Sequence, residues 1–211
     1  MKIDFEVNTK DYTEYCINCH RPNMLRQQRD NDALSYVCTN CDTTNPRALI
    51  MDPQLMWEIA PDNEYCHSSV GAFIFNQKND FLMFKLNKFP FGATIPAGHV
   101  DVGESAKKAV EREIKEEVNI PVVGLVRLMQ TTIDGDGCRR GADRHHWTVF
   151  CARVTSDVAP VVDKSEGAHP VWVSLRQAQQ RTNCFAVDYI LDKHIAKIEH
   201  YLSRGRLGLH E

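Results

Sequence analysis

The order of apolar and polar residues divides the chain at about residue 62. After that point two short apolar runs, 70–75 and 81–86, flank the polar segment 76–80. Apolar runs on either side of a five-residue polar turn predict a β-hairpin. Before residue 62, apolar residues recur without a sustained period. We therefore expect a small N-terminal part with a connector, residues 1–62, and one larger domain, residues 63–211.

A helical pattern follows the hairpin over residues 105–118. Ser105 is a suitable N-cap, and Asn119, which tolerates a left-handed conformation, is a suitable end. One face of the segment is apolar and carries Val110, Ile114 and Val118. The segment is therefore predicted to be an amphipathic helix whose apolar stripe faces the core.

The neighbouring face of this helix is acidic. At about 100° per residue, Glu113, Glu116 and Glu117 share an arc of roughly 100°. A solvated face would place lysines four residues from these glutamates, but Lys108 and Lys115 lie on the opposite side. Clustered carboxylates repel each other unless a cation compensates, and several hard oxygen ligands suit Mg²⁺ or Mn²⁺. This pattern favours a divalent-metal site over an ordinary surface helix.

Four of the eight cysteines form two C-x2-C pairs in the N-terminal part. Cys16 and Cys19 are followed, after eighteen residues, by Cys38 and Cys41. Each pair can aim two thiolates at one tetrahedral ion, so the spacing predicts a structural Zn²⁺ site in a zinc ribbon. A disulfide framework is the alternative, but it is typical of secreted chains, and the other cysteines are scattered. Because so short a segment buries little apolar surface, its folding is expected to depend on zinc.

Composition and charge narrow the classes of partner. The chain has 211 residues, 25% of them charged, and a net charge of −3. No global positive field attracts the protein to nucleic acid or to a membrane surface. The longest apolar run falls far short of the roughly 18 to 20 residues of a membrane span. We therefore expect a soluble cytoplasmic protein whose partners are recognised at specific sites.

The stretch from residue 98 to residue 120, "GHVDVGESAKKAVEREIKEEVNI", resembles the Nudix box. That motif is a glycine, five residues, a glutamate, seven residues, then Arg-Glu, an aliphatic residue, any residue, Glu-Glu, any residue, glycine and an aliphatic residue. Eight of its nine defined positions match in register, and the departure is Asn119 where the family usually has glycine. A four-cysteine ribbon before such a domain is similar to the arrangement in NADH pyrophosphatases and ADP-ribose pyrophosphatases. The Ser-Gln-Pro-Trp-Pro-Phe-Pro stretch of the NADH-type proteins is absent here.

The resemblance implies a fold over roughly residues 67–200. It is an α/β sandwich with a mixed sheet, the box helix on one face and the C-terminal segment on the other, preceded by the zinc ribbon. The C-terminal segment is expected to contain two helices because "RTNCF" interrupts it.

The resemblance also implies metal-dependent hydrolysis of a nucleoside diphosphate linked to another moiety. Residues are carried over by their position in the motif. The metal ligands are Glu113, Glu116, Glu117 and the Gly98 carbonyl, and Glu104 and Arg112 orient this cluster. The general base is either Glu113 or a carboxylate of a later loop, for which Glu166 is the candidate and Asp163 a weaker one. The partner is a small nucleotide derivative; capped RNA is not indicated, and homodimers are common in such families.

A glycine-containing loop lies between the strand-like segments 124–133 and 147–154. It carries Arg139, Arg140 and Arg144, which could clamp the phosphates of a substrate. A solvated hairpin tip is the equally weighted alternative. Cys138 in the same loop is expected to be a small filler, with no base beside it.

Two other classes of function remain as alternatives. In one, the ribbon makes the chain an RNA- or protein-binding module, and the Nudix domain is only a scaffold; the intact carboxylates argue against it. In the other, the chain is a Nudix-fold isomerase of the isopentenyl diphosphate kind, which needs a cysteine in the pocket and usually a divergent box. The near-complete box favours hydrolysis.

Overall fold

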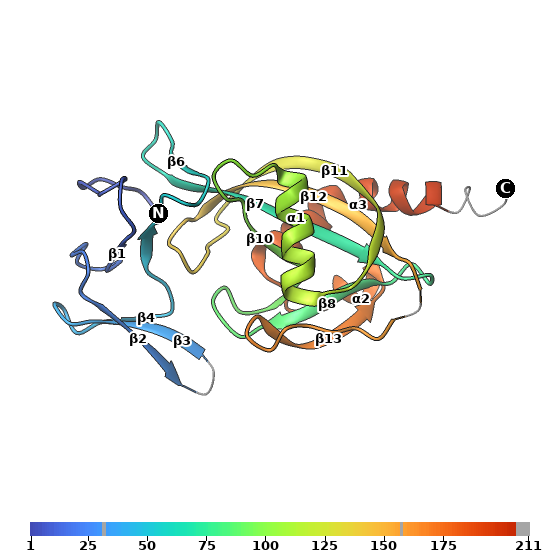
Figure 1. The fold of residues 1–211 in the computed structure, drawn as a ribbon, viewed down its shortest axis with the longest axis horizontal. Helices are drawn as coiled ribbons and strands as arrows, with labels where there is room; N and C mark the ends of the chain where they lie inside the picture. Colours follow the sequence, from blue (N-terminus) through green and yellow to red (C-terminus); the bar gives the residue numbers. More distant parts are fainter. Residues whose placement is uncertain (31–32, 157, 206–211) are drawn as a thin grey trace.

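The centre of the molecule is an eight-stranded mixed β-sheet, shown in Figure 1. The computed structural model describes residues 1–30, 33–156 and 158–205. The strands of this sheet are β6 (Trp57–Ile59), β7 (Tyr65–Phe75), β8 (Phe81–Leu86), β9 (Ala93–Thr94), β10 (Ala97–His99), β11 (Val122–Asp134), β12 (Arg144–Val154) and β13 (Gly167–Val173). The main order is β11-β12-β7-β8-β13, with β6 and β10 also paired to β7, and β9 to β8.

Strands β7 and β12 are the only parallel pair among the described strands of this sheet. Nearly every residue of β7 is buried, as expected for a strand covered on both faces. The predicted hairpin is confirmed: β7 and β8 are joined by residues 76–80. The Asn76 side-chain oxygen accepts hydrogen bonds from the amides of Lys78 and Asp80, at 2.9 and 3.0 Å, which closes the turn.

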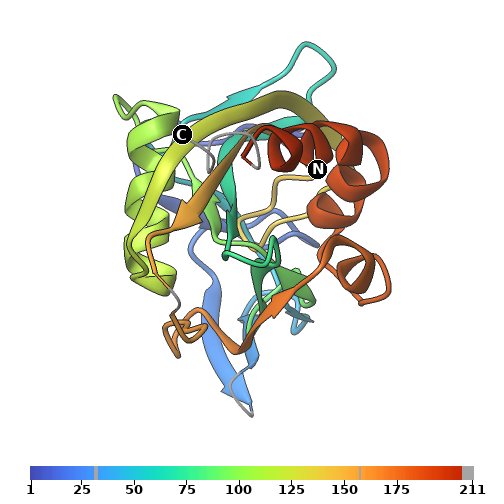
Figure 2. The ribbon, with the colours of Figure 1, turned by 90° about the vertical axis from the view of Figure 1, so that its right-hand side faces the viewer.

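Helices cover both faces of the sheet (Figure 2). On one face lies α1 (Ala106–Glu113), continued by the π-helical segment η1 (Ile114–Val118); on the other lie α2 (Leu175–Ala178) and α3 (Phe185–Gly205). Val110 and Ile114 pack against one side of the sheet, whereas Ile190 and Leu191 of α3 pack against the other. The α/β sandwich and the interruption between α2 and α3 were therefore predicted correctly.

The box helix has the predicted ends but an unexpected second half. Ser105 caps it, because its hydroxyl accepts a hydrogen bond from the Lys108 amide at 3.3 Å. The Asn119 amide donates to the Ile114 carbonyl, five residues earlier, at 2.8 Å, which is the hydrogen bond of a π-helix. Asn119 itself is left-handed, with φ 46° and ψ 38°.

The N-terminal part contains two small sheets. One pairs β1 (Thr13–Tyr15) with β5 (Leu49–Met51), and the other contains β2 (Leu25–Asp30), β3 (Ala33–Cys38) and β4 (Thr44–Asn45). Figure 1 shows this part at the end of the molecule opposite the C-terminus.

The two predicted parts of the chain are joined by more than a connector. Strand β6 lies before residue 62, yet it pairs with β7 in the large sheet. Leu49 and Met51 also share a hydrophobic cluster with Tyr65 and Ala142 of the larger part. Within the described ranges, no helix is long and apolar enough to cross a membrane.

Candidate active site

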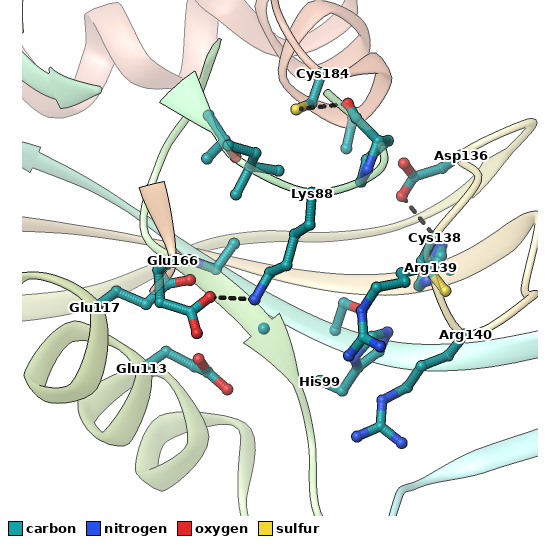
Figure 3. A pocket seen from close by; sticks show the side chains of 18 of the residues that line it. Lys88, His99, Glu113, Glu117, Asp136, Cys138, Arg139, Arg140, Glu166 and Cys184 are labelled. Atoms are coloured by element: carbon teal, nitrogen blue, oxygen red, sulfur yellow. Dashed lines mark hydrogen bonds and ion pairs between the residues drawn. The ribbon is translucent and has the colours of Figure 1, made fainter. Parts of the chain in front are cut away.

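A cavity of about 350 Å³ opens beside the C-terminal half of the box helix. It is lined by residues of η1, β10, the loop before β12 and the loop before β13. Figure 3 shows Glu113, Glu117 and Glu166 on one side of this cavity and Arg139 and Arg140 on the other. Glu116 also lines the cavity, and the Lys88 side chain reaches Glu166 on the side of the glutamates.

Two of the three predicted metal ligands are buried carboxylates. Glu113 is 9% exposed and Glu117 is 5% exposed, whereas the Glu116 side chain is 59% exposed. Burial raises the pKa of both Glu113 and Glu117, and the nearby Glu113 raises that of Glu117 further. The Ala97 amide donates to Glu117 Oε2 at 2.8 Å and fixes this side chain toward β10.

The glycine at position 98 is required by the packing of this cluster. A Cβ atom at that position would overlap the Glu113 carboxylate. The backbone of β10 therefore approaches Glu113 as closely as a residue without a side chain allows. This brings the two predicted ligand positions, Glu113 and the Gly98 backbone, side by side.

Arg112 connects the box loop to the box helix. Its guanidinium donates to Glu104 at 3.0 and 3.2 Å, and to Glu113 Oε1 at 2.6 Å. It also donates to the His99 carbonyl at 3.0 Å and to Glu116 at 3.4 Å. The pKa of Glu104 is lowered mainly by its hydrogen bonding with Arg112. Arg112 therefore contacts Glu104 of the box loop and two carboxylates of the box helix, Glu113 and Glu116.

The late-loop carboxylate Glu166 lies at the same cavity and forms an ion pair with Lys88. The loop is anchored to the box helix, because the Asp163 amide donates to the Glu117 carbonyl at 2.7 Å. The Asp163 side chain instead accepts from the Ser165 amide and hydroxyl, at 2.8 and 2.6 Å, and does not line the cavity. These hydrogen bonds lower the pKa of Asp163.

The three arginines of the loop before β12 have different positions. Arg139 and Arg140 line the cavity, where Arg139 contacts the Tyr36 hydroxyl and Arg140 is 2.8 Å from Asp52. Arg144 does not line it, because its guanidinium is paired with Asp62 and Asp134. The loop is not a free hairpin tip: the amides of residues 48 and 50 donate to the carbonyls of Arg139 and Arg140, both at 3.1 Å.

A cluster of histidines around Cys138 was not predicted from the sequence. Cys138 Sγ is 3.5 Å from His67 Nδ1, and His99 and His145 complete the group. The expectation of no base beside Cys138 was therefore wrong. Burial alone would raise the pKa of Cys138, but the neighbouring histidines lower it well below its usual value. Burial lowers the pKa of His67 to about 4. Burial acts in the same direction on His145, but Cys138 and Asp136 outweigh it and raise the pKa of His145 to about 10.

The other residues that sequence reasoning missed are Lys88 and Asp136. Neither belongs to a recognisable motif, and the members of the histidine cluster are 32, 39 and 7 residues apart along the chain. His99 lies inside the box motif, but at a position that the motif leaves undefined. No local signal indicates that these side chains meet.

The four ribbon cysteines lie close together and form no disulfide. Cys16 Sγ is 3.6 Å from Cys41 Sγ, and Cys19 Sγ is 3.7 Å from Cys38 Sγ. Four thiolates around a tetrahedral zinc ion, each at ~2.3 Å, are separated by ~3.8 Å. A backbone hydrogen bond from Arg21 is the main cause that lowers the pKa of Cys19 to about 6. The cluster is thus compatible with the predicted zinc ribbon.

Comparisons with known proteins give the family and the fold. The family model described as "NUDIX domain" matches residues 66–193. An Ap4A hydrolase of C. elegans is 22% identical, covers 65% of this chain and 98% of its own, and has a TM-score of 0.51. The NUDIX domain of Shewanella oneidensis NrtR, solved with ADP ribose, is 17% identical, with coverages of 64% and 88% and a TM-score of 0.52. Comparison with curated proteins gives no match.

Proposed function

Since this chain belongs to the Nudix family, we propose that it hydrolyses a nucleoside diphosphate linked to another moiety, using Mg²⁺ or Mn²⁺. The observation that carries the proposal is that Glu113, Glu116 and Glu117 line one cavity with Arg139 and Arg140, and that Glu113 and Glu117 face the two arginines. Acidic ligands for a cation on one side and guanidinium groups on the other suit a diphosphate between them.

The charges of the cluster fit a divalent cation. Two positive side chains, Arg112 and Lys88, contact or adjoin a larger set of carboxylates: Asp101, Glu104, Glu113, Glu116, Glu117 and Glu166. Six carboxylates against two cations leave an excess of four negative charges, if all are ionised. Hard oxygen donors in this number favour Mg²⁺ or Mn²⁺ over softer metals. Glu113, Glu116, Glu117 and the Gly98 carbonyl are the proposed ligands.

When bound, the metal would contact the phosphate oxygens and neutralise the charge that develops as the P–O bond breaks. The side chains of the protein have separate tasks. Glu166 accepts the proton of the attacking water, and the ion pair with Lys88 holds its carboxylate at the cavity. Arg139 and Arg140 bind the substrate phosphates, because planar guanidinium groups match phosphate oxygens. Arg112 and Glu104 keep the ligands oriented.

In the N-terminal part we propose that Cys16, Cys19, Cys38 and Cys41 hold a structural Zn²⁺ ion. The two knuckles supply all four thiolates, so no position is left for substrate. The ion would stabilise the small β2-β3-β4 sheet, which has few buried apolar residues of its own.

A substrate panel tests the proposed hydrolysis. The full chain, with Mg²⁺ or Mn²⁺, would be incubated with ADP-ribose, NAD(H), diadenosine polyphosphates, nucleoside triphosphates, nucleotide sugars and capped RNA. We expect metal-dependent cleavage of at least one compound, a loss of about 10²-fold or more in Glu117→Gln, and parent activity in Glu111→Gln, whose side chain is exposed. No metal-dependent cleavage of any compound would contradict the proposal.

One observation keeps the isomerase alternative in the test. Cys138 lines the cavity, and a cysteine in the pocket is what an isomerase of this fold needs. Isopentenyl diphosphate therefore belongs in the panel. Conversion of this compound without release of phosphate, abolished in Cys138→Ser, would favour the isomerase over the hydrolase.

A further inference from the structure

We infer that His67, His99, Cys138 and His145 form a second transition-metal site, of the kind that takes Zn²⁺, in the wall of the active-site cavity. One ligand atom from each of the four residues lies within 4.8 Å of all the others. This site is separate from the glutamate cluster and from the ribbon cysteines, with which it shares no residue.

The fold brings the four residues together from distant parts of the chain. His67 and His145 are directly opposite each other in the parallel pair β7 and β12. β10 pairs with β7 as well, and it places His99 opposite Ser69, two residues from His67. The ring centroids of the three histidines are 4.7, 5.6 and 5.7 Å apart. Cys138 reaches the rings from the loop that precedes β12.

The spacing of the ligand atoms agrees with a tetrahedral ion. Zinc–sulfur and zinc–nitrogen bonds of ~2.3 and ~2.0–2.1 Å, at a tetrahedral angle, separate sulfur from nitrogen by about 3.6 Å. The observed separation of Cys138 Sγ from His67 Nδ1 is 3.5 Å. His67 is fully buried, and its Nε2 atom has no hydrogen-bond partner among the described residues. Neither nitrogen of this ring is therefore committed to a structural acceptor.

A buried carboxylate, Asp136, lies directly beside the cluster. Asp136 Oδ2 is 3.1 Å from His145 Nδ1, which is an ion-pair distance, and Nδ1 makes no hydrogen bond of normal geometry among the described residues. Trp147 Nε1 donates to the same Asp136 oxygen at 2.7 Å and fixes its position. Asp136 is itself 5% exposed.

The donor set selects the metal and suggests its role. Three imidazoles and one thiolate suit Zn²⁺, whereas the oxygen ligands of the glutamate cluster suit Mg²⁺ or Mn²⁺. Four protein ligands leave no open position, so the ion would be structural. It would hold Cys138 against the sheet, and thereby fix the next two residues, Arg139 and Arg140, at the cavity.

Metal content tests this inference independently of any catalytic activity. The full chain would be purified with zinc and without strong chelators, and its metal measured by mass spectrometry. We expect two zinc ions per chain in the parent, one in Cys138→Ser, and one in a variant with Cys19→Ser and Cys41→Ser. Cys184→Ser is the matched control, because Cys184 is a buried cysteine outside both clusters, and it should keep two.

A second variant tests the same site in case Cys138→Ser does not fold. His99 is only half-buried, so His99→Ala should fold and still lose one zinc ion. With Co²⁺ in place of Zn²⁺, the ribbon thiolates give charge-transfer absorption in every variant that keeps them. This absorption should be weaker in Cys138→Ser than in the parent, and unchanged in Cys184→Ser. The inference is overturned if folded Cys138→Ser and His99→Ala keep the parent metal content. It is also overturned if the parent holds a single ion that is lost with the ribbon cysteines.

Discussion

Glu117 combines burial with a negative charge, and this gives a prediction for stability. In the unfolded chain it ionises near 4.5, but in the folded protein burial raises its pKa well above that value. Above pH 4.5 the unfolded state therefore holds fewer protons than the folded state. The contribution of Glu117 to the free energy of unfolding falls as the pH rises through this window.

Without added Mg²⁺ or Mn²⁺, Glu117→Gln should consequently be more thermally stable than the parent, and the difference in Tm should grow from pH 5 to pH 8. Glutamine stays neutral and can still accept the Ala97 hydrogen bond. Thermal melts across this range measure the effect, with Glu111→Gln as the control on the exposed face. A difference in Tm that shrinks with rising pH would contradict the assigned role of burial.

Glu166 is the carboxylate that we expect to act as general base. Glu166→Gln should lower kcat by about 10² to 10⁴-fold, because that is the usual contribution of general-base catalysis. Asp163→Asn is the control from the same loop, since the Asp163 side chain is engaged by Ser165 and lies outside the cavity. Steady-state rates of the parent, Glu166→Gln and Asp163→Asn on the best substrate of the panel test this expectation. If Glu166→Gln stays within about threefold of the parent, the base lies elsewhere.

At the scale of the element, the end of the box helix depends on one left-handed residue. Asn119→Gly should leave the free energy of unfolding unchanged, because glycine accepts φ 46° without steric cost. Asn119→Val should lower it by about 1–2 kcal/mol, because a β-branched side chain crowds the backbone in this conformation. Urea denaturation of the two variants measures the difference. Equal stability of the two would show that the helix end tolerates any residue.

The guanidinium of Arg112 joins the box loop to the box helix, and lysine cannot replace it. Arg112→Lys should lower kcat by about 10 to 100-fold, the usual cost of losing a partner that orients metal ligands. The single ammonium group of lysine cannot contact Glu104, Glu113 and the His99 carbonyl together, as the guanidinium of Arg112 does. Arg127→Lys, an exposed change on β11, is the control and should keep the parent rate. An unchanged kcat in Arg112→Lys would remove Arg112 from the positioning network.

The elements that the sequence predicted are those with local signals. The hairpin at residues 76–80 and the helix from Ser105 to Asn119 follow from periodicity and turn residues within a few positions. The π-helical half of the box helix did not follow from these signals, because it differs from an α-helix only in which carbonyls its amides contact, as the Asn119 amide shows. The family motif located Glu113, Glu116 and Glu117, whereas no motif located Lys88 or Asp136.

Pairing between distant strands explains what could not be predicted. His67 and His145 are neighbours only because β7 and β12 pair in parallel with one particular register. A shift by one residue would turn one of the two side chains to the opposite face of the sheet. The position of Arg139 and Arg140 likewise depends on backbone contacts with residues 48 and 50, in the other predicted part of the chain.

At the scale of the whole molecule, the N-terminal part and the larger part should not be separable without loss. A chain of residues 63–211 lacks Leu49 and Met51, both fully buried in the shared cluster. Burial of two such side chains contributes about 3–6 kcal/mol, at ~1.5–3 kcal/mol each. We expect a much lower urea midpoint for the truncated chain, and reduced activity because the loop with Arg139 loses its support.

A point variant separates this effect from the deletion itself. In the full chain, Leu49→Ala should cost about 2–5 kcal/mol of stability, whereas Val123→Ala, at an exposed apolar position, should cost little. The same denaturation curves measure both. A truncated chain with the stability and activity of the full chain would mean that residues 63–211 need no support from residues 1–62.

The spacing of the two proposed zinc sites along the chain sets the order in which a ribosome can complete them. The last ribbon cysteine, Cys41, is made 104 residues before His145, the last ligand of the site in the sheet. At about 5 to 20 residues per second, this interval lasts roughly 5 to 20 s. The nascent ribbon can therefore capture zinc while the sheet is still incomplete. We expect a cell that runs short of zinc during synthesis to produce chains with a filled ribbon and an unfilled histidine cluster.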